Sequence, residues 1–590
     1  MAIENLITDH LDLWTAAVRP KSSAGRGSNS KLELTGIKKL RELILELAVR
    51  GKLVPQDPSD EPASVLLERI AAEKARLVKE EGLRTSANEV VDIADEYIEC
   101  PSHWKWIRLG NIAKFIDYRG KTPNKIDAGV RLITAKNIRY GYIDLVPEEF
   151  ISEADYEQWM TRGFPRVGDT LFTTEAPLGN AAVIDINERF ALAQRAICFQ
   201  WHYSAISRFM LIQILASPFQ NQLLDNSSGM TATGVKASRL KEIPVVVPPV
   251  EEQHRIVAKV DELMALCDQL ELCSESQLAA HQTLVETLLV TLTDSCDADE
   301  LAQNWARLST HFDILFTTEA SIDALKQSIL QLAVMGKLVP QDPSDEPASA
   351  LLERIAAEKA RLVKEKKIKK EKPLPAISEN EKPFELPQGW EWCHLKDIIT
   401  IMDAGWSPAC PPESSPDIDT WGVLKTTAVQ TLEYREYENK VLDKTKTPRP
   451  EYEVMVGDIL ITRAGPKNRV GISCLVEKTR PKLMISDKII RFHLVEVGLS
   501  ERFISLCLNA GATAVYIDDS KSGMAESQMN ISQDKLKLAP IPLGPIKEQN
   551  HIMDRVDQLM TLCDQLKVCL QTSQQTQLAL AESLVEGALA

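Results

Sequence analysis

The chain has 590 residues, of which 44% are hydrophobic and 26% charged, the composition of a soluble globular protein with several domains. No apolar run reaches the roughly 18 residues that a membrane span needs, and the first residues lack the basic and apolar regions of a secretory signal. The eleven cysteines form no CxxC pair, so we expect reduced thiols in a cytoplasmic protein and no zinc site.

The formal net charge of −16 argues at first against a nucleic-acid partner. The charge is unevenly distributed, however. Residues 251–300 contain twelve acids and two bases, whereas residues 104–140 contain nine bases and two acids, and residues 460–491 contain eight bases and two acids. Because local charge decides the attraction of phosphates, these two basic stretches keep a nucleic-acid partner open.

A near-exact internal repeat begins close to the N-terminus. The sequence GKLVPQDPSDEPASVLLERIAAEKARLVKE at residues 51–80 returns at residues 336–365 with one change, from Val65 to Ala350. Apolar residues at helical spacing before each copy predict a helix that the first glycine closes at its C′ position. The proline-rich PQDPSDEP predicts a turn, and the remaining residues predict a second helix that ends near residue 80.

A second pair of copies predicts long helices. EEQHRIVAKVDELMALCDQLELC at residues 251–273 corresponds to KEQNHIMDRVDQLMTLCDQLKVC at residues 547–569. Apolar residues spaced alternately by four and three predict the a/d seam of a coiled coil, and a pair of ordinary amphipathic core helices is the alternative. A helix over residues 251–293 would be about 60 Å long. The predicted seam comprises Ile256, Val260, Leu263, Cys267, Leu270, Leu284 and Leu288 in the first copy, and Ile552, Val556, Leu559, Cys563, Leu566, Leu570, Leu580 and Leu584 in the second.

Between these helices lie two stretches with the pattern of mixed α/β domains. Each begins with two tryptophans, in SHWKWIRLGNIAKF (residues 102–115) and QGWEWCHLKDIITI (residues 388–401). Each contains a Gly-Asp turn beside a strand, in VGDTLFTTEAP and VGDILITRAGP, and ends with apolar strands flanked by prolines. They are two copies of one fold with diverged side chains. We interpret the four tryptophans as hinge or core residues rather than stacking platforms.

Polar segments at residues 22–30 and 364–383 predict linkers and complete the organisation. The fold class is α+β and multidomain: two α/β domains are separated and flanked by long helices that form an antiparallel coiled coil with a pseudo-twofold internal repeat. The expected parts are an N-terminal helical region with a flexible linker (1–97), the first α/β domain (98–250), a central helical region and linker (251–383), the second α/β domain (384–546) and a C-terminal helix (547–590).

This arrangement resembles the specificity (S) subunit of type I restriction-modification enzymes, and the GKLVPQDP and EPAS segments resemble the EcoA-like subgroup. The resemblance implies that the α/β domains are target recognition domains, each reading one half of a bipartite double-stranded DNA site. It implies that the helices space these domains and dock two modification (methyltransferase) subunits, and that restriction (ATP-dependent translocase/endonuclease) subunits join them. S-adenosylmethionine, ATP and Mg²⁺ are then expected on the partner subunits, with no cofactor, no catalysis and no membrane contact in this chain.

Two other classes remain open. The chain could be a non-catalytic helical scaffold whose α/β domains bind protein rather than DNA, or a self-contained nuclease or methyltransferase. The sequence contains no GxxxxGK[ST] phosphate loop and no HExxH, and no glycine-rich S-adenosylmethionine loop stands out. The absence of these motifs favours a chain that depends on partners for catalysis.

Candidate DNA contacts lie in polar loops, because Arg, Lys, Asn and Gln side chains pair with bases or phosphates and Glu accepts from cytosine. The segment TTEAPLGNAA of the first domain corresponds to TRAGPKNRVG of the second, and this exchange of charge favours base reading over shared phosphate contacts. The candidates are Arg119, Lys121, Lys125, Lys136, Asn137, Arg139, Thr174, Glu175, Asn180, Thr231, Thr233 and Lys236 in the first domain, and Arg463, Lys467, Asn468, Arg469, Lys488, Gln528 and Asn530 in the second.

Overall fold

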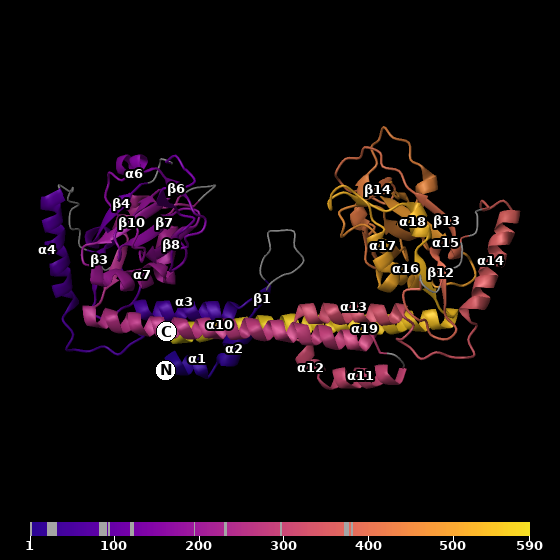
Figure 1. Ribbon diagram of the computed structural model, residues 1–590, viewed down its shortest axis with the longest axis horizontal. Helices are drawn as coiled ribbons and strands as arrows, with labels where there is room; N and C mark the ends of the chain where they lie inside the picture. Colours follow the sequence, from indigo (N-terminus) through magenta and orange to yellow (C-terminus); the bar gives the residue numbers. More distant parts are fainter. Residues whose placement is uncertain are drawn as a thin grey trace. The chain divides into compact units, whose positions relative to one another are not determined.

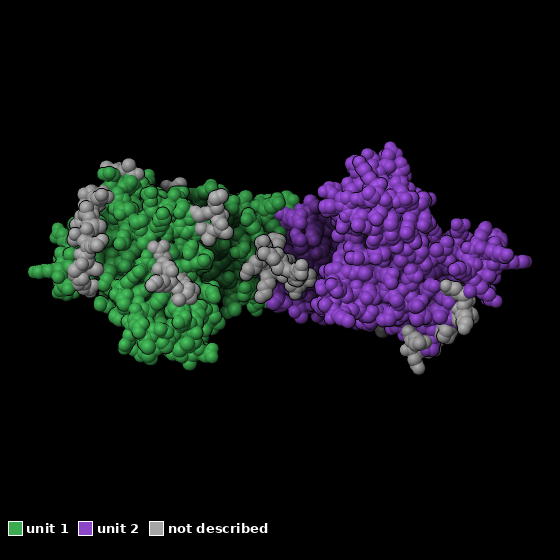
Figure 2. Space-filling model, turned by 90° about the horizontal axis from the view of Figure 1, so that it is seen from above, with its two compact units in different colours: residues 1–277, 572–590 green, residues 278–571 purple. Residues whose placement is uncertain are grey.

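The computed structural model describes residues 3–20, 32–81, 91–92, 95–118, 123–193, 195–228, 233–295, 298–370, 374, 377–378 and 382–589 (Figure 1). The linker predicted at residues 22–30 lies outside these ranges. The chain forms two compact units: unit 1 contains residues 1–277 and 572–590, and unit 2 contains residues 278–571 (Figure 2). Each unit contains one α/β domain together with helical segments from distant parts of the sequence.

Unit 1 places its α/β domain between helix α4 and the start of helix α10. A four-stranded sheet has the order β4-β10-β7-β8, a three-stranded sheet the order β6-β5-β9, and β11 pairs with β3. The bounds are α1 (Ile3–Thr8), α2 (Leu11–Ala16), α3 (Thr35–Val49), α4 (Ala63–Glu81), β3 (Lys105–Arg108), α5 (Leu109–Ile112), β4 (Ala113–Asp117), β5 (Val130–Ile133), β6 (Phe150–Ile151), α6 (Glu153–Trp159), β7 (Thr170–Thr174), β8 (Leu178–Val183), β9 (Phe190–Leu192), β10 (Ala196–Trp201), α7 (Ser207–Leu215), α8 (Ser217–Asp225), α9 (Ala237–Glu242), β11 (Pro244–Val247) and α10 (Val250–Thr293).

Unit 2 repeats this order. Its sheets are β13-β22-β18-β20, β17-β14-β21 and β12-β24. The bounds are α11 (Ala298–Thr310), α12 (Phe312–Leu315), α13 (Glu319–Val334), α14 (Ala348–Lys364), β12 (Glu391–His394), α15 (Leu395–Ile398), β13 (Ile399–Ala404), β14 (Gly422–Leu424), β15 (Val429–Gln430), β16 (Glu433–Tyr434), β17 (Asn439–Val441), β18 (Ile459–Thr462), β19 (Ala464–Gly465), β20 (Ser473–Leu475), β21 (Leu483–Met484), β22 (Ile489–Leu494), α16 (Glu501–Asn509), α17 (Gly511–Asp519), β23 (Met529–Asn530), α18 (Gln533–Lys537), β24 (Pro540–Leu543) and α19 (Ile546–Leu589).

The two α/β domains share one topology. In both, the four-stranded sheet is antiparallel, and the three-stranded sheet contains one parallel pair, β5 with β9 and β14 with β21. The central strands β7 and β18 are buried along their whole length, so apolar side chains cover both faces of each sheet. The prediction of two copies of one mixed fold is confirmed.

The near-identical segments form the same helix–turn–helix in each unit. Gly51 and Gly336 follow helices α3 and α13 with φ of +67° and +69°, the left-handed conformation that glycine adopts without strain. The N–H of the next residue then donates to a carbonyl five positions back, Lys52 to Leu47 at 2.9 Å and Lys337 to Leu332 at 3.0 Å, as in a Schellman motif. The predicted C′ glycine is confirmed in both copies.

The long helices α10 and α19 each contain 44 residues, or about 66 Å at 1.5 Å per residue. Unit 1 combines residues 250–277 of α10 with residues 572–589 of α19, and unit 2 combines the remaining parts, the chain order of an antiparallel pair. Within each unit, a shorter helix also packs against one of the two long helices through an ion pair. Arg41 of α3 pairs with Asp268 of α10 at 2.6 Å, and Lys326 of α13 pairs with Asp564 of α19.

The predicted heptad seam holds over the first turns of each long helix and in part beyond them, where Leu288, Leu566 and Leu570 are partly buried against the helical core. Ile256 and Cys267 are fully buried, but Leu284 and Leu580 are 51% and 53% exposed, so their assignment to the seam is wrong. Val285 and Leu578 are buried instead. A straight α-helix drifts away from a strict seven-residue period, and the buried positions Leu263, Ser274 and Val285 are spaced by eleven.

Candidate nucleic-acid interface

In unit 2, three segments meet at the end of strand β18. The Arg463 N–H donates to the Lys488 carbonyl at 2.8 Å, and the Arg463 carbonyl accepts from the Ile531 N–H at 3.0 Å. Beyond Arg463, β19 pairs antiparallel with β23. Residues 463–469, 486–488 and 521–531, which lie apart in the sequence, therefore form one contiguous group, here called the tip cluster of unit 2.

The outer side of this cluster is polar and basic. Lys467, Asn468, Lys488, Gln528 and Asn530 are exposed, and Arg463 is half-buried. The backbone is fixed beneath them, since the Lys467 N–H donates to the Glu526 carbonyl at 2.7 Å. Cationic and amide side chains on a rigid ribbon suit a polyanion that also offers hydrogen-bonding edges, as duplex DNA does.

Unit 1 contains the same backbone frame. The Thr174 N–H donates to the Arg195 carbonyl at 2.9 Å, and the Thr174 carbonyl accepts from the Val235 N–H at 3.0 Å. Glu175 forms a β-bridge with Gly234, as Ala464 does with Asn530 in unit 2. Residues 174–180, 195 and 233–235 are the tip cluster of unit 1.

The side chains on this frame differ between the units. Thr174 occupies the backbone position of Arg463 but is 2% exposed, and its hydroxyl donates to the Arg195 carbonyl at 3.1 Å. Arg195 occupies the position of Lys488 and pairs through Nε with Glu175 Oε1 at 2.9 Å. Unit 1 thus presents a paired carboxylate and guanidinium where unit 2 presents two cations.

Arg195 is absent from the candidates that sequence reasoning produced. Its φ of +64° places it in a left-handed turn directly before strand β10, and its side chain is half exposed. Aligning Arg195-Ala196-Ile197 with Lys488-Ile489-Ile490 across the repeat would have indicated it, because Lys488 was already a candidate.

Asn137 points inward rather than to the surface. It is 1% exposed, its side-chain oxygen accepts from the Thr134 N–H at 3.1 Å, and its amide nitrogen donates to the carbonyls of Asp144 (2.9 Å) and Pro147 (3.1 Å). These bonds hold the loop of residues 134–147. With both polar atoms of its side chain occupied, Asn137 has no group left for a base.

Asn180 and Arg469 also hold local structure. Asn180 Nδ2 donates to the Ile138 carbonyl at 3.0 Å, and Arg469 Nη2 donates to the Val429 carbonyl at 2.8 Å. Arg469 Nη1 also donates to Gln430 at 2.8 Å, and burial lowers the pKa of Arg469 from its ordinary value. Each side chain therefore anchors a neighbouring hairpin.

The remaining candidates lie at the surface or outside the described residues. Lys125 and Lys136 pair with Glu149 at 2.7 and 3.7 Å, and Arg139 Nη2 is 3.3 Å from Asp144. Thr233, within the tip cluster of unit 1, and Lys236, directly after it, are exposed. Arg119, Lys121 and Thr231 lie outside the described residues.

The first tryptophan of each pair joins the α/β domain to its long helix. Trp104 Nε1 donates to Glu252 at 3.0 Å, and Trp390 Nε1 donates to Glu548 at 3.0 Å. Trp104, Trp390 and Trp392 are 3%, 5% and 8% exposed, which confirms a packing role for these three. Burial raises the pKa of Glu548 above its ordinary value.

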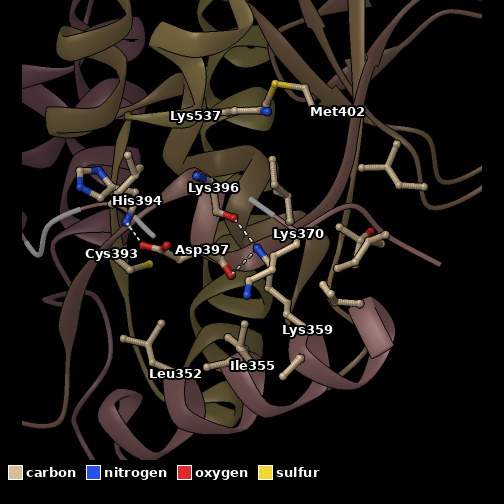
Figure 3. A pocket seen from close by; sticks show the side chains of 18 of the residues that line it. Leu352, Ile355, Lys359, Lys370, Cys393, His394, Lys396, Asp397, Met402 and Lys537 are labelled. Carbon is tan, nitrogen blue, oxygen red and sulfur yellow. Dashed lines mark hydrogen bonds between the residues drawn. The ribbon is translucent and has the colours of Figure 1, made fainter. Parts of the chain in front are cut away.

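The near-identical helices α4 and α14 pack on their domains through the same lysine. Lys74 Nζ donates to Asn111 at 2.8 Å, and Lys359 Nζ donates to the carbonyls of Lys396 (2.7 Å) and Asp397 (3.3 Å) at the end of α15 (Figure 3). In unit 2 this junction borders a cavity of about 980 Å³, lined by apolar residues of α14 and several lysines. The lysine joins helix to domain in both units, which gives one physical reason for the near-identity of the copies.

Within the described ranges, no group of three or more His, Cys, Asp or Glu side chains is placed to hold a metal ion. Nor does any described helix combine the length and apolar character of a membrane span.

Comparison with known proteins identifies a family and two full-length relatives. Residues 101–278 match the family described as the type I restriction modification DNA specificity domain. Two Escherichia coli proteins match over the whole of both chains: the specificity subunit of type I restriction enzyme EcoEI, 52% identical over 613 residues, and that of EcoAI, 40% identical over 623 residues.

Two solved structures align over most of the chain. The HsdS subunit from Thermoanaerobacter tengcongensis is 16% identical, covers 84% of this chain and 99% of its own, and gives a TM-score of 0.40. A chain from a structure on the complex assembly and conformational transition of the type I R-M system is 16% identical, covers 83% of this chain and 98% of its own, and gives a TM-score of 0.45.

Two α/β domains joined to long helices, together with the match to the DNA specificity domain and to two specificity subunits, define a DNA-recognition subunit of a restriction system rather than a catalyst. The full-length identity makes the assignment specific: the chain belongs to the specificity subunits of type I restriction enzymes, in the group that contains the EcoAI subunit. The resemblance drawn from the sequence is confirmed.

Proposed function

We propose that each α/β domain reads one half of a bipartite DNA target through its tip cluster. The supporting observation is that the two tip clusters share the same backbone hydrogen bonds but have different side chains. Unit 1 has Glu175 with Arg195, and unit 2 has Arg463 with Lys488. Shared phosphate contacts would keep the same cations in both units, whereas readers of two different half-sites need different side chains.

The proposed organisation assigns recognition to residues 98–250 and 384–546. The helical parts, residues 1–97, 251–383 and 547–590, act as the spacer and as the docking site for modification subunits. Half-sites one helical turn apart lie about 34–36 Å from each other, and stiff helices hold such a distance better than loops do. The proposed contact residues are exposed or half-buried positions in the tip clusters and the adjoining loops: Lys125, Lys136, Arg139, Glu175, Arg195, Thr233, Lys236, Arg463, Lys467, Asn468, Lys488, Gln528 and Asn530.

Catalysis belongs to partners in this proposal. Two modification subunits bind S-adenosylmethionine and methylate adenine, and restriction subunits use ATP and Mg²⁺ to cleave DNA. The complex acts in the cytoplasm, where it meets both the host chromosome and invading DNA.

The test is a DNA-binding measurement on the chain co-expressed with its modification subunits. Sequencing methylated adenines in a host with and without the chain identifies the target. A duplex of that sequence should bind at least a thousandfold more tightly than a scrambled duplex, with affinity that falls as salt rises. A scaffold whose α/β domains bind protein would produce no new methylated motif and no salt-dependent DNA affinity.

A further inference from the structure

A short hairpin of unit 1, residues 138–143, lies against the tip cluster. Ile138 bridges Ile143, and the Arg139 N–H donates to the Tyr142 carbonyl at 2.9 Å. Two contacts attach the hairpin to strand β8: Asn180 Nδ2 donates to the Ile138 carbonyl at 3.0 Å, and the Gly141 N–H donates to the Ala181 carbonyl at 2.9 Å. Strand β8 follows directly on the Glu175 turn, so hairpin and tip cluster form one supported surface.

Unit 2 has the same hairpin at residues 429–434. The Arg435 N–H donates to the Ala428 carbonyl at 2.9 Å, as the Asp144 N–H donates to the Asn137 carbonyl at 2.7 Å in unit 1. The Leu432 N–H donates to Ser473 of β20 at 3.0 Å, as Gly141 does to β8. Arg469 anchors this hairpin through the Val429 carbonyl, the counterpart of Ile138. The hairpin therefore belongs to the repeated frame.

The hairpin tips differ in chemistry. In unit 1 the tip presents Arg139, Tyr140 and Tyr142, and the two tyrosines are 50% and 60% exposed. In unit 2 the corresponding residues are Gln430, Thr431 and Glu433, with no aromatic ring. Gln430 is bound by Arg469 at 2.8 Å, and Glu433 pairs with Arg435 at 2.7 Å. The same hairpin therefore has aromatic and basic side chains at its tip in unit 1 and polar side chains at its tip in unit 2.

The side chains of the two tyrosines differ in their hydrogen bonds. The Tyr140 hydroxyl donates to the Leu215 carbonyl at 2.5 Å, whereas the Tyr142 side chain makes no hydrogen bond within the described residues. The hairpin thus offers an exposed aromatic ring and a guanidinium, which also pairs with Asp144, and such side chains pack on bases and contact phosphates. Apolar contact with a thymine methyl group, or partial insertion at a base step, discriminates between sequences.

We propose that hairpin 138–143 is a second reading element of unit 1, in which Tyr142 packs against bases of its half-site and Arg139 contacts the adjacent backbone. The equivalent hairpin of unit 2 reads the other half-site through Thr431 and Glu433. This inference rests on the proposed function, because it adds residues to the same recognition surface.

The experiment uses the full chain co-expressed with its modification subunits, with Tyr142→Ala as the perturbation and Tyr142→Phe as the control that keeps the ring. Tyr142→Ala should weaken binding to the target duplex about 5- to 150-fold, as removing one base contact does, and leave the slope of affinity against salt unchanged. Tyr142→Phe should bind within about threefold of the wild type. The thermal midpoint should stay within about 2 °C for both variants, because the side chain is exposed.

Methylated-adenine sequencing supplies the specificity readout. The Tyr142→Ala complex should tolerate substitutions only in the half-site that unit 1 reads, and the matched variant Glu433→Ala should relax only the other half. Unchanged affinity and motif in Tyr142→Ala, or a relaxation of both halves with a lower thermal midpoint, would overturn the proposal. Failure of the proposed function is distinguishable, since the wild-type complex would then show no specific, salt-dependent binding at all.

Discussion

The joint between Trp390 and Glu548 allows a sharp test of how the second α/β domain is attached to its long helix. Trp390 is 5% exposed, and its ring lies so close to Gly544 that a Cβ there would be 2.5 Å from the ring. Its Nε1 donates to a buried carboxylate at 3.0 Å. A hydrogen bond to a charged group contributes about 1.5–3 kcal/mol, and Trp390→Phe removes it together with part of the ring packing. For a unit of this size the thermal midpoint should fall by about 3–9 °C.

Unlike Trp390→Phe, the variant Glu548→Gln should become more stable relative to the wild type as the pH rises. Glutamine keeps an oxygen that accepts from Trp390 but removes the buried charge. Burial raises the pKa of Glu548 above its ordinary value of 4.5, so the folded chain holds this proton more strongly than the unfolded chain does. The stability that this carboxyl contributes is present below pH 4.5 and is lost as the pH rises through the raised pKa. The midpoint of Glu548→Gln relative to the wild type should therefore increase from pH 4.5 to pH 8.

Differential scanning fluorimetry of the full chain across this pH range measures both effects, and Glu496→Gln, at an exposed position of the same unit, is the matched control. The reasoning is refuted if Glu548→Gln melts as far below the wild type at pH 8 as Trp390→Phe does. It is also refuted if the exposed control shows the same dependence on pH.

Three further predictions concern the interface and the helices. Arg463→Ala combined with Lys488→Ala should relax the methylated motif only in the half-site that unit 2 reads, because the two side chains are proposed to read bases there. Methylated-adenine sequencing measures this, and an unchanged motif would remove both residues from base reading. Asn137→Ala should lower the thermal midpoint by several degrees without changing the methylated motif, because it breaks buried hydrogen bonds of a loop; an altered motif at an unchanged midpoint would contradict this. Lys326→Ala should lower the midpoint by less than about 3 °C, because its pair with Asp564 is partly exposed, and a larger drop would mean that the pair contributes more than surface pairs usually do.

Helix positions were largely predictable from the sequence, because they follow from local patterns. The helix expected over residues 251–293 spans Val250–Thr293, and the one expected to end near residue 80 ends at Glu81. The seam was predictable over the first turns of each long helix but not at every later position, since small differences between 3.5 and 3.6 residues per turn accumulate along a helix of this length. Leu284 and Leu580 show where the extrapolation failed.

Side-chain direction in the loops was not predictable in the same way. Asn137 has the residue type of an adenine reader, yet its burial depends on the carbonyls of Asp144 and Pro147, which the sequence does not place near it. Arg195 was missed because its proximity to Thr174 arises from the pairing of β7 with β10. The first case depends on how a loop folds back on itself and the second on strand register, and a single sequence determines neither.

The central claim is that two α/β domains on one repeated frame read two unlike half-sites. Exchanging residues 98–250 for the corresponding domain of another specificity subunit, followed by methylated-adenine sequencing, tests it most directly. The account predicts a new motif that retains one original half-site and replaces the other. A motif changed in both halves, or one left unchanged by a folded, assembled hybrid, would contradict it.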